Sequence, residues 1–209
     1  MGLPTIDDPE PRRGNRADAK AATRGKLLAA AKGIFLATGY QGATLDAIAA
    51  KAGFTKGAVY WHFPNKQALF LALVAESISD NLAQLEGMLV EHRGDPDRLR
   101  STLASWIDGI DGRETLPIFG VELEIEARRD SSFRALHQDL IGKHEAALAG
   151  FLTHYFDAVG EAPVMPTDQL AATLITVFKG FALIHQNRPD MPVTSAKGVR
   201  CLLGLPIGD

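Results

Sequence analysis

The sequence has a single cysteine and no long uninterrupted apolar run. Cys201 excludes a disulfide within the 209 residues and a cysteine-based zinc site, and its apolar neighbours predict a packed side chain. No apolar stretch approaches the roughly 20 residues that span a bilayer, and the first residues carry no apolar signal core. We therefore expect a cytoplasmic protein with no membrane partner.

Recognisable catalytic motifs are lacking as well. The sequence contains no G-x-S-x-G, P-loop, G-x-G-x-x-G or H-E-x-x-H pattern. His137 and His144 share one face of a predicted helix, but they lie about 10.5 Å apart along it, too far to bind one metal ion. We expect no enzyme activity, no metal and no cofactor. An alternative, a small all-α enzyme with a central cavity, would need a convergent acid/base pair that the sequence does not offer.

The net charge of −3 is distributed unevenly. Residues 1–66 hold ten Lys/Arg and five Asp/Glu, a balance of +5, whereas residues 67–209 hold twelve and twenty, a balance of −8. A basic part next to an acidic one is typical of a chain whose basic part contacts phosphate. Residues 1–17, rich in proline and charge, are predicted to be a disordered tail.

Residues 44–66, TLDAIAAKAGFTKGAVYWHFPNK, predict two short helices joined by a tight turn. Thr44 is a suitable N-cap, and apolar residues recur after it at the spacing of one buried helical face. Gly53 ends the first helix because glycine takes the left-handed conformation at little steric cost, and Thr55 caps the second. This arrangement is a helix-turn-helix, whose second helix fits the DNA major groove.

The second helix carries three aromatic residues and a histidine within four positions, 60–63. Aromatic stripes at helical spacing are usually buried, so a core role has to be considered. From packing alone, we give the core role and the surface role about equal weight. A short amphipathic helix can bury only some of these rings, so at least one is predicted to lie on the surface. Lys56 lies near the helix N-terminus, where backbone N–H groups favour an anion such as phosphate.

The run from Thr23 to about Phe70 resembles the DNA-binding domain of the tetracycline-repressor (TetR) family of bacterial transcriptional regulators. The residues that carry the resemblance are Ala30, Ala31, Phe35, Gly39, Thr44, Ile48, Ala49, Ala52, Gly53, the run from Lys56 to Phe63, Asn65 and Lys66. The resemblance implies a homodimeric, ligand-responsive repressor that is released from a palindromic operator by a small hydrophobic effector. The predicted DNA contacts are Thr44, Lys56 and Lys66 on phosphates, with Thr55, Gly57, Tyr60, Trp61 and His62 at or near base edges.

The expected fold is all-α, with about nine helices, a helix-turn-helix domain over residues 18–66 and a larger domain over residues 67–209. Helical periodicity and capping residues place the helices at about 18–38, 44–52, 55–63, 65–93, 96–110, 116–129, 131–159, 167–187 and 194–203. No alternating strand pattern is present.

The larger domain is expected to hold the effector pocket and the dimer interface. Trp106, Phe119, Phe151 and Tyr155 are pocket candidates, because ligand cavities are mostly apolar with a few polar anchors. Glu122, with Glu126, could favour a cationic lipophile, although surface glutamates paired with Arg129 are the better interpretation. The effector is left unassigned.

For the dimer, the resemblance implies the last two long helices. Small residues there allow close helix approach and aromatic residues could fill a four-helix seam; the candidates are Ala171, Gly180, Phe178 and Phe181. Packing within one chain is the alternative for these four. Two other functions stay open: a helical carrier of hydrophobic molecules with a vestigial helix-turn-helix, and an activator instead of a repressor, since the sign depends on operator position.

Overall fold

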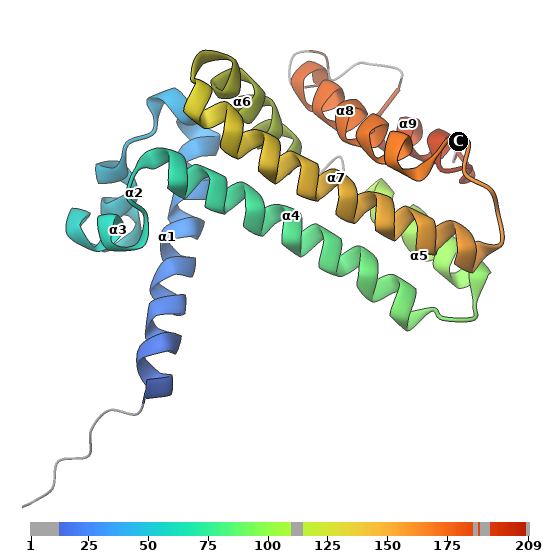
Figure 1. The fold of residues 1–209 in the computed structure, drawn as a ribbon, viewed down its shortest axis with the longest axis horizontal. Helices are drawn as coiled ribbons and strands as arrows, with labels where there is room; N and C mark the ends of the chain where they lie inside the picture. Colours follow the sequence, from blue (N-terminus) through green and yellow to red (C-terminus); the bar gives the residue numbers. More distant parts are fainter. Residues whose placement is uncertain (1–12, 110–114, 186–187, 189–192, 208–209) are drawn as a thin grey trace, which may run out of the picture. The chain divides into compact units, whose positions relative to one another are not determined.

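The computed structural model of the chain describes residues 13–109, 115–185, 188 and 193–207. These residues form nine α-helices and no strand, so the predicted all-α class and helix order are confirmed for the described part of the chain (Figure 1). The chain divides into two compact units, Met1–Phe70 and Leu71–Asp209.

The smaller unit contains α1 (Arg13–Gly42), α2 (Leu45–Ala52), α3 (Lys56–His62) and the first turn of α4 (Lys66–Glu91). The helix α1 is longer than predicted, because residues 13–17 are helical and do not belong to a disordered tail. The rest of that predicted tail, residues 1–12, lies outside the described residues. Gly39, expected to end the helix, breaks it locally with a φ of 67° and a ψ of 174°.

The two short helices are held by the predicted caps. The hydroxyl oxygen of Thr44 accepts a hydrogen bond from the backbone N–H of Ala47 at 3.2 Å, and that of Thr55 accepts one from Ala58 at 3.3 Å. Gly53 has a φ of 74°, which a residue with a side chain adopts only with strain. These caps fix the turn between α2 and α3, and they confirm the predicted helix-turn-helix.

The boundary between the units falls after Phe70, inside α4, and not after residue 66 as predicted. The reason is aromatic packing. The ring of Phe70 lies 4.8 Å from that of Phe35 and 5.0 Å from that of Tyr40, both on α1. The first turn of α4 is therefore part of the core of the smaller unit.

The larger unit contains the rest of α4 together with α5 (Pro96–Asp108), α6 (Thr115–Arg129), α7 (Ser131–Val159), α8 (Thr167–His185) and α9 (Ser195–Leu202). The helices α7 and α8 pack side by side, α6 packs against both, and α9 packs against α5 and α8. Asp95 caps α5 ahead of Pro96, as predicted, and Asp130 caps α7.

Cys201 is exposed, so the prediction of a packed cysteine is wrong. The helix α9 is strongly amphipathic, and its buried side chains are those of Ser195, Ala196 and Val199. Cys201 lies on the opposite face of this short helix. The apolar neighbours in the sequence misled the prediction because helical periodicity, and not local composition, decides which face is buried.

The helix α4 contains an 18-residue window with a mean hydropathy of 1.2, and by length and composition it could cross a membrane. This differs from the sequence-based expectation, which counted only uninterrupted apolar runs. Core helices of soluble proteins share the property, and one face of α4 faces the interior of the larger unit through Val74, Ile78 and Leu85.

Candidate nucleic-acid interface and ligand cavity

The helix α3 divides its aromatic residues between core and surface. Val59 and Phe63 are buried, whereas the side chains of Tyr60 and Trp61 are 47% and 66% exposed. The structure therefore places two of the three rings on the surface, as the crowding of aromatics predicted. Rings of this size on an exposed helix face offer both stacking area and a hydrogen-bonding group to a partner.

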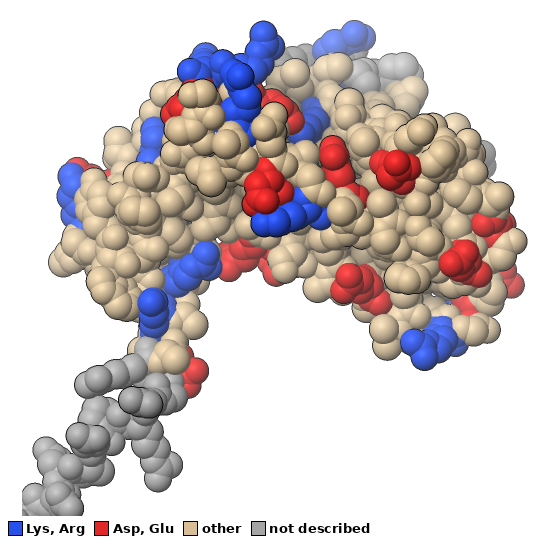
Figure 2. All heavy atoms as spheres, in the orientation of Figure 1, with Lys and Arg blue, Asp and Glu red and all other residues tan. Residues whose placement is uncertain are grey.

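Two basic residues of α1 lie beside these rings, and sequence analysis did not single them out. The Lys20 ammonium lies 4.6 Å from the centre of the Trp61 ring, and the Arg24 guanidinium lies 5.3 Å from that of Phe63. Their spacing of four residues on one helical face is the signal that could have identified them. Figure 2 shows basic side chains on α1, and both acidic and basic side chains on the visible face of the larger unit.

The positive charge next to α3 also affects His62. Burial lowers the pKa of this imidazole, and the charges of Lys20 and Arg24 lower it further. His62 is half-buried, and its ring meets that of Trp61 edge-on at 4.7 Å. Its neutral form can both donate and accept a hydrogen bond.

Lys56, at the start of α3, is exposed but already paired. Its ammonium lies 2.9 Å from each of the two carboxylate oxygens of Asp46 on α2. The hydrogen bond to Asp46 and the charge of Asp46 raise the pKa of Lys56. A phosphate contact by Lys56 would therefore compete with this ion pair.

Lys66 is half-buried, and its ammonium is already engaged by backbone groups of the smaller unit. Its ammonium donates hydrogen bonds to the carbonyl oxygens of Tyr40, at 2.7 Å, and Ala43, at 3.1 Å. The same group lies 4.5 Å from the centre of the Tyr40 ring. Lys66 thus joins the start of α4 to the end of α1, and we correct its predicted role to a structural one.

The remaining predicted contact residues lie at the N-terminal ends of α2 and α3. Thr44 and Thr55 are exposed and use their hydroxyl oxygens as caps, which leaves each hydroxyl hydrogen for another acceptor. Gly57 is exposed, and a Cβ built there would meet only Thr55 Oγ1, at 3.9 Å. A partner can therefore approach the backbone of α3 closely at this glycine.

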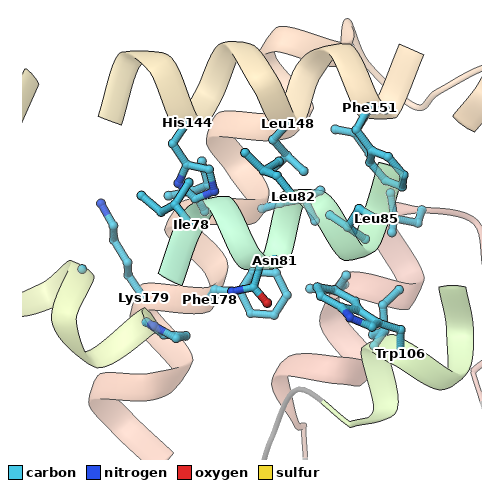
Figure 3. Close-up of a pocket in the computed structure, with 18 of the residues that line it drawn as sticks. Ile78, Asn81, Leu82, Leu85, Trp106, His144, Leu148, Phe151, Phe178 and Lys179 are labelled. Carbon is cyan, nitrogen blue, oxygen red and sulfur yellow. The ribbon is translucent and has the colours of Figure 1, made fainter. Parts of the chain in front are cut away.

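The larger unit contains a cavity of about 140 Å³ (Figure 3). Its wall is formed by all six helices from α4 to α9 and is mostly apolar; it includes Ile78, Leu82, Leu85, Trp106, Leu148, Phe151 and Phe178. Trp106 and Phe151 were predicted to line a pocket, and the structure brings them together on this wall. Phe119 and Tyr155 are instead fully buried off the wall, and Glu122 lies half-buried away from it.

Three polar side chains reach the wall: Asn81, His144 and Lys179. Burial, and secondarily the charge of Lys179, lowers the pKa of His144 to about 4, so its imidazole is neutral near pH 7. The Lys179 ammonium donates a hydrogen bond to the Glu124 carboxylate on α6 at 2.6 Å.

Glu124 joins three helices next to the cavity. Its carboxylate oxygen Oε1, which accepts the hydrogen bond from Lys179 of α8, also lies 3.2 Å from the Nε2 atom of His137 on α7. Burial alone would raise the pKa of Glu124, but the hydrogen bond and charge of Lys179 and the proximity of His137 outweigh it and lower the pKa. Sequence analysis missed Glu124 and Lys179, since nothing in the spacing between α6 and α8 marks them as a pair.

The pair Glu122 and Glu126 does not face the cavity. Glu126 is buried and forms an ion pair with Arg129 at 3.1 Å. The predicted pairing with Arg129 is thus present, although for a buried glutamate and not a surface one. Neither carboxylate is on the wall of this cavity, so the alternative of a cationic lipophile has no support from it.

The predicted dimer residues occupy different environments. Ala171 is fully buried within the chain, which leaves it no surface for a second copy, so that prediction is wrong. Phe178 lies on the cavity wall, and Phe181 is half-buried against Gly198 of α9. Gly180 is also half-buried. Among the described side chains of α8, the large apolar ones that are exposed are Leu183 and Ile184, 57% and 44% exposed, near its C-terminal end.

The fold and the surface of α3 define a helix-turn-helix DNA-binding protein with an all-α partner domain. Residues 27–73 match a family model described as "Bacterial regulatory proteins, tetR family". The chain is 30% identical over 175 residues to the HTH-type transcriptional repressor AcnR of Corynebacterium glutamicum, covering 78% of this chain and 82% of AcnR. The chain belongs to the TetR family of transcriptional regulators, whose members are DNA-binding transcription factors and not enzymes.

Other similarities are more partial. The chain is 34% identical over 100 residues to the transcriptional activator FasR of Mycolicibacterium smegmatis, which covers 48% of this chain and 45% of FasR. The match to the regulator SrpR of Pseudomonas putida, 51% identical over 53 residues, covers 25% of each chain. The chain thus matches less than half the length of these two relatives.

Among solved structures, the FadR regulator of Bacillus subtilis, in complex with stearoyl-CoA, has a TM-score of 0.63 at 18% identity and covers 88% of this chain and 97% of its own. The fatty acid degradation regulator FadR of Bacillus halodurans has a TM-score of 0.66 at 16% identity, with coverages of 89% and 95%. Both similarities concern the fold.

Proposed function

We propose that this TetR-family protein is a homodimeric repressor that binds a near-palindromic operator and is released from it by a small hydrophobic effector. The observation that carries the proposal is the exposure of Tyr60 and Trp61 on a helix whose opposite face is buried. A second helix of a helix-turn-helix with large exposed side chains is suited to base edges in the major groove.

The residues around α3 divide into two groups in this proposal. Tyr60 and Trp61, with His62 and the backbone at Gly57, reach base edges, and Thr55 lies at the helix N-terminus next to them. Phosphates are contacted by Thr44 and Lys56, together with the basic residues Lys20 and Arg24 of α1. Lys66 is left out of the second group because the backbone of the α1 terminus occupies its ammonium.

The dimer follows from the symmetry of such operators. Two recognition helices must enter successive major grooves about 34–36 Å apart, which requires two copies of the chain. The exposed apolar end of α8, at Leu183 and Ile184, is the surface we assign to the second copy. The neighbouring Gly180 and Phe181 form the edge of this surface, and Ala171 is not part of it.

The effector acts through α4. This helix begins in the smaller unit, crosses the boundary at Phe70, and supplies Val74, Ile78 and Leu82 to the cavity wall. A ligand that favours one position of α4 changes the spacing of the two recognition helices. A coupling of about 1–3 kcal/mol, or roughly 5- to 150-fold in affinity, is enough to release the operator.

The second candidate function is activation of transcription instead of repression. FasR is named an activator and AcnR a repressor. The match to AcnR covers 78% of this chain and therefore includes much of the larger unit, which favours repression. An activator would require the same α3 surface and the same dimer.

A selection experiment tests the proposal directly. The purified full chain is used to enrich fragments from a random DNA library, and the enriched sequence is measured by mobility shift over a salt series. We expect an inverted repeat, an affinity that falls steeply with salt, and a dimer mass in sedimentation analysis. A monomeric chain, or enrichment of no sequence above nonspecific binding, would favour the carrier alternative and end the regulator proposal.

A further inference from the structure

Two of the three polar side chains of the cavity wall, those of His144 and Lys179, lie at one end. Figure 3 shows His144 and Lys179 on one side of the cavity, and Leu85, Phe151 and Trp106 on the other. The cavity is therefore asymmetric: α7 and α8 form an end with a basic side chain, and the remainder is apolar apart from Asn81 of α4. An asymmetric lining of this kind orients an amphipathic ligand.

The polar end carries positive charge and no carboxylate. Among the described residues that form the wall, Lys179 is the only cation, and none is acidic. Its side chain is 18% exposed, so its charge acts across a poorly solvated space. A cationic ligand would meet this charge and no carboxylate on the wall itself, because Glu124, the partner of Lys179, is not among the wall residues.

The ion pair between Lys179 and Glu124 leaves room for a ligand. An ammonium group has three N–H donors, and Glu124 accepts one of them at 2.6 Å. The Glu124 side chain is 47% exposed, so water can solvate it when Lys179 turns to another anion. Lys179 is therefore a positive donor that is already held at the cavity by an exchangeable partner.

His144 adds a second hydrogen-bonding group without adding charge. Its pKa of about 4 keeps the imidazole neutral near pH 7, and a neutral imidazole has one N–H donor and one acceptor. The volume limits what these groups can hold. About 140 Å³ is close to the roughly 150 Å³ cavity that binds benzene, and below the roughly 300–1,000 Å³ of drug-sized pockets.

We propose that the cavity binds a small amphipathic anion, with a carboxylate-type head on Lys179 and His144 and an apolar body of about one six-membered ring against Phe151 and Trp106. This inference rests on the proposed function in taking the cavity as the effector site. It goes beyond that function in fixing the sign of the ligand's charge and the residue that selects it.

Three probes of matched shape test the charge preference: cyclohexanecarboxylate, cyclohexylmethanol and cyclohexylmethylamine, which are anionic, neutral and cationic at pH 7.5. None absorbs where tryptophan does. Trp61 is one of only two tryptophans in the sequence, so a Trp61→Phe chain reports binding through Trp106 alone. Calorimetry on the unmodified full chain gives the affinities. We expect the carboxylate to bind most tightly, then the alcohol, with the amine weakest.

Two variants of opposite effect locate the preference. Lys179→Met should weaken the carboxylate at least about tenfold, because a hydrogen bond to a charged group is lost, and should leave the alcohol unchanged. Unchanged alcohol binding also demonstrates an intact cavity. Glu124→Gln should strengthen the carboxylate, because Lys179 loses its competing partner. Lys143→Met is the matched control, since Lys143 is an exposed lysine of α7 paired with Asp139.

The proposal is overturned if the amine binds as tightly as the carboxylate, if Lys179→Met leaves carboxylate binding unchanged, or if none of the probes alters Trp106 fluorescence. The proposed function fails separately, in the DNA selection carried out without any probe. Selective carboxylate binding by a chain that ignores DNA would keep this inference and remove the regulator. Operator binding with no preference among the three probes would keep the regulator and remove this inference.

Discussion

The Lys66 ammonium, in the first turn of α4, donates a 2.7 Å hydrogen bond to the backbone carbonyl oxygen of Tyr40 and lies 4.5 Å from the centre of the Tyr40 ring. Tyr40 follows the break in α1 at Gly39, where carbonyl groups near the end of a helix lack partners within it. A lysine from the next long helix supplies those partners, as cations near helix C-termini commonly do. These hydrogen bonds join the end of α1 to the start of α4, the two helices that precede and follow the helix-turn-helix in the chain.

Replacement of Lys66 should therefore destabilise the smaller unit. We expect Lys66→Met to lower the free energy of unfolding by about 1–3 kcal/mol, because partly buried carbonyl groups lose a charged donor. Lys56→Met is the control: Lys56 is an exposed lysine in an ion pair with Asp46, and its loss should leave the free energy of unfolding nearly unchanged. Urea unfolding followed by circular dichroism measures both. Equal stability of the two variants would contradict the structural role of Lys66.

The Asp46–Lys56 ion pair predicts an effect on DNA binding. Asp46→Asn releases the Lys56 ammonium and removes a negative charge beside α3, so we expect tighter DNA binding and a steeper salt dependence, by about one unit of slope per chain. A small loss of stability should accompany it, about 0.3–1 kcal/mol, because Asp46 lies in the first turn of α2.

The control for this variant is Asp139→Asn, which breaks an exposed ion pair with Lys143 on α7 in the larger unit. It makes the same change of net charge at a distance in sequence from the helix-turn-helix. Mobility shifts between low and high salt compare the two variants. If both change the DNA affinity equally, Lys56 has no specific part in phosphate contact.

His144 predicts a pH dependence of stability. Burial and the charge of Lys179 lower its pKa to about 4 in the folded chain, whereas an unfolded chain has an ordinary value of about 6.5. The unfolded state therefore binds more protons between these values, and stability falls as the pH falls from about 6.5 to 4. The full loss of stability is on the order of 3 kcal/mol, and no loss occurs above pH 7.

The variant His144→Gln should show a shallower loss of stability between pH 6.5 and 4 than the unmodified chain. His154→Gln, which replaces an exposed histidine of the same helix, is the matched control and should follow the unmodified curve. Thermal midpoints at half-unit pH intervals measure the difference. Superimposable curves for His144→Gln and His154→Gln would show that His144 is not held in its neutral form.

The sequence was most informative where local rules decide the structure. The caps at Thr44 and Thr55 and the left-handed glycine at Gly53 depend on neighbours within a few residues, and the structure confirms each of them. The exposure of α3 was predictable from crowding alone. The same local rules placed the helices of the larger unit to within a few residues.

Prediction was weakest for side chains whose partners lie far away in sequence. Lys66 looked like a phosphate ligand because its partners, on the end of α1, are not visible in its own helix. Ala171 has the small size of an interface residue, but packing within one chain buries it completely. Glu124 and Lys179, the pair beside the cavity, are 55 residues apart, and only the packing of α6 against α8 brings them together.

Tyr60 is the sharpest test of the DNA interface. Its side chain is 47% exposed, so Tyr60→Ala removes little packing and should leave helicity, dimer mass and the thermal midpoint unchanged. A good base contact contributes about 1–3 kcal/mol, so two copies in a dimer should lose about 2–6 kcal/mol together and specific binding should disappear. Val90→Ala, at another exposed apolar residue, is the control and should bind as the unmodified chain does. Mobility shifts on the selected DNA and on a scrambled sequence separate specific from nonspecific binding. Nanomolar, sequence-specific binding by Tyr60→Ala would remove Tyr60 from the recognition surface and leave Trp61 as the one large exposed ring of α3 that could contact bases.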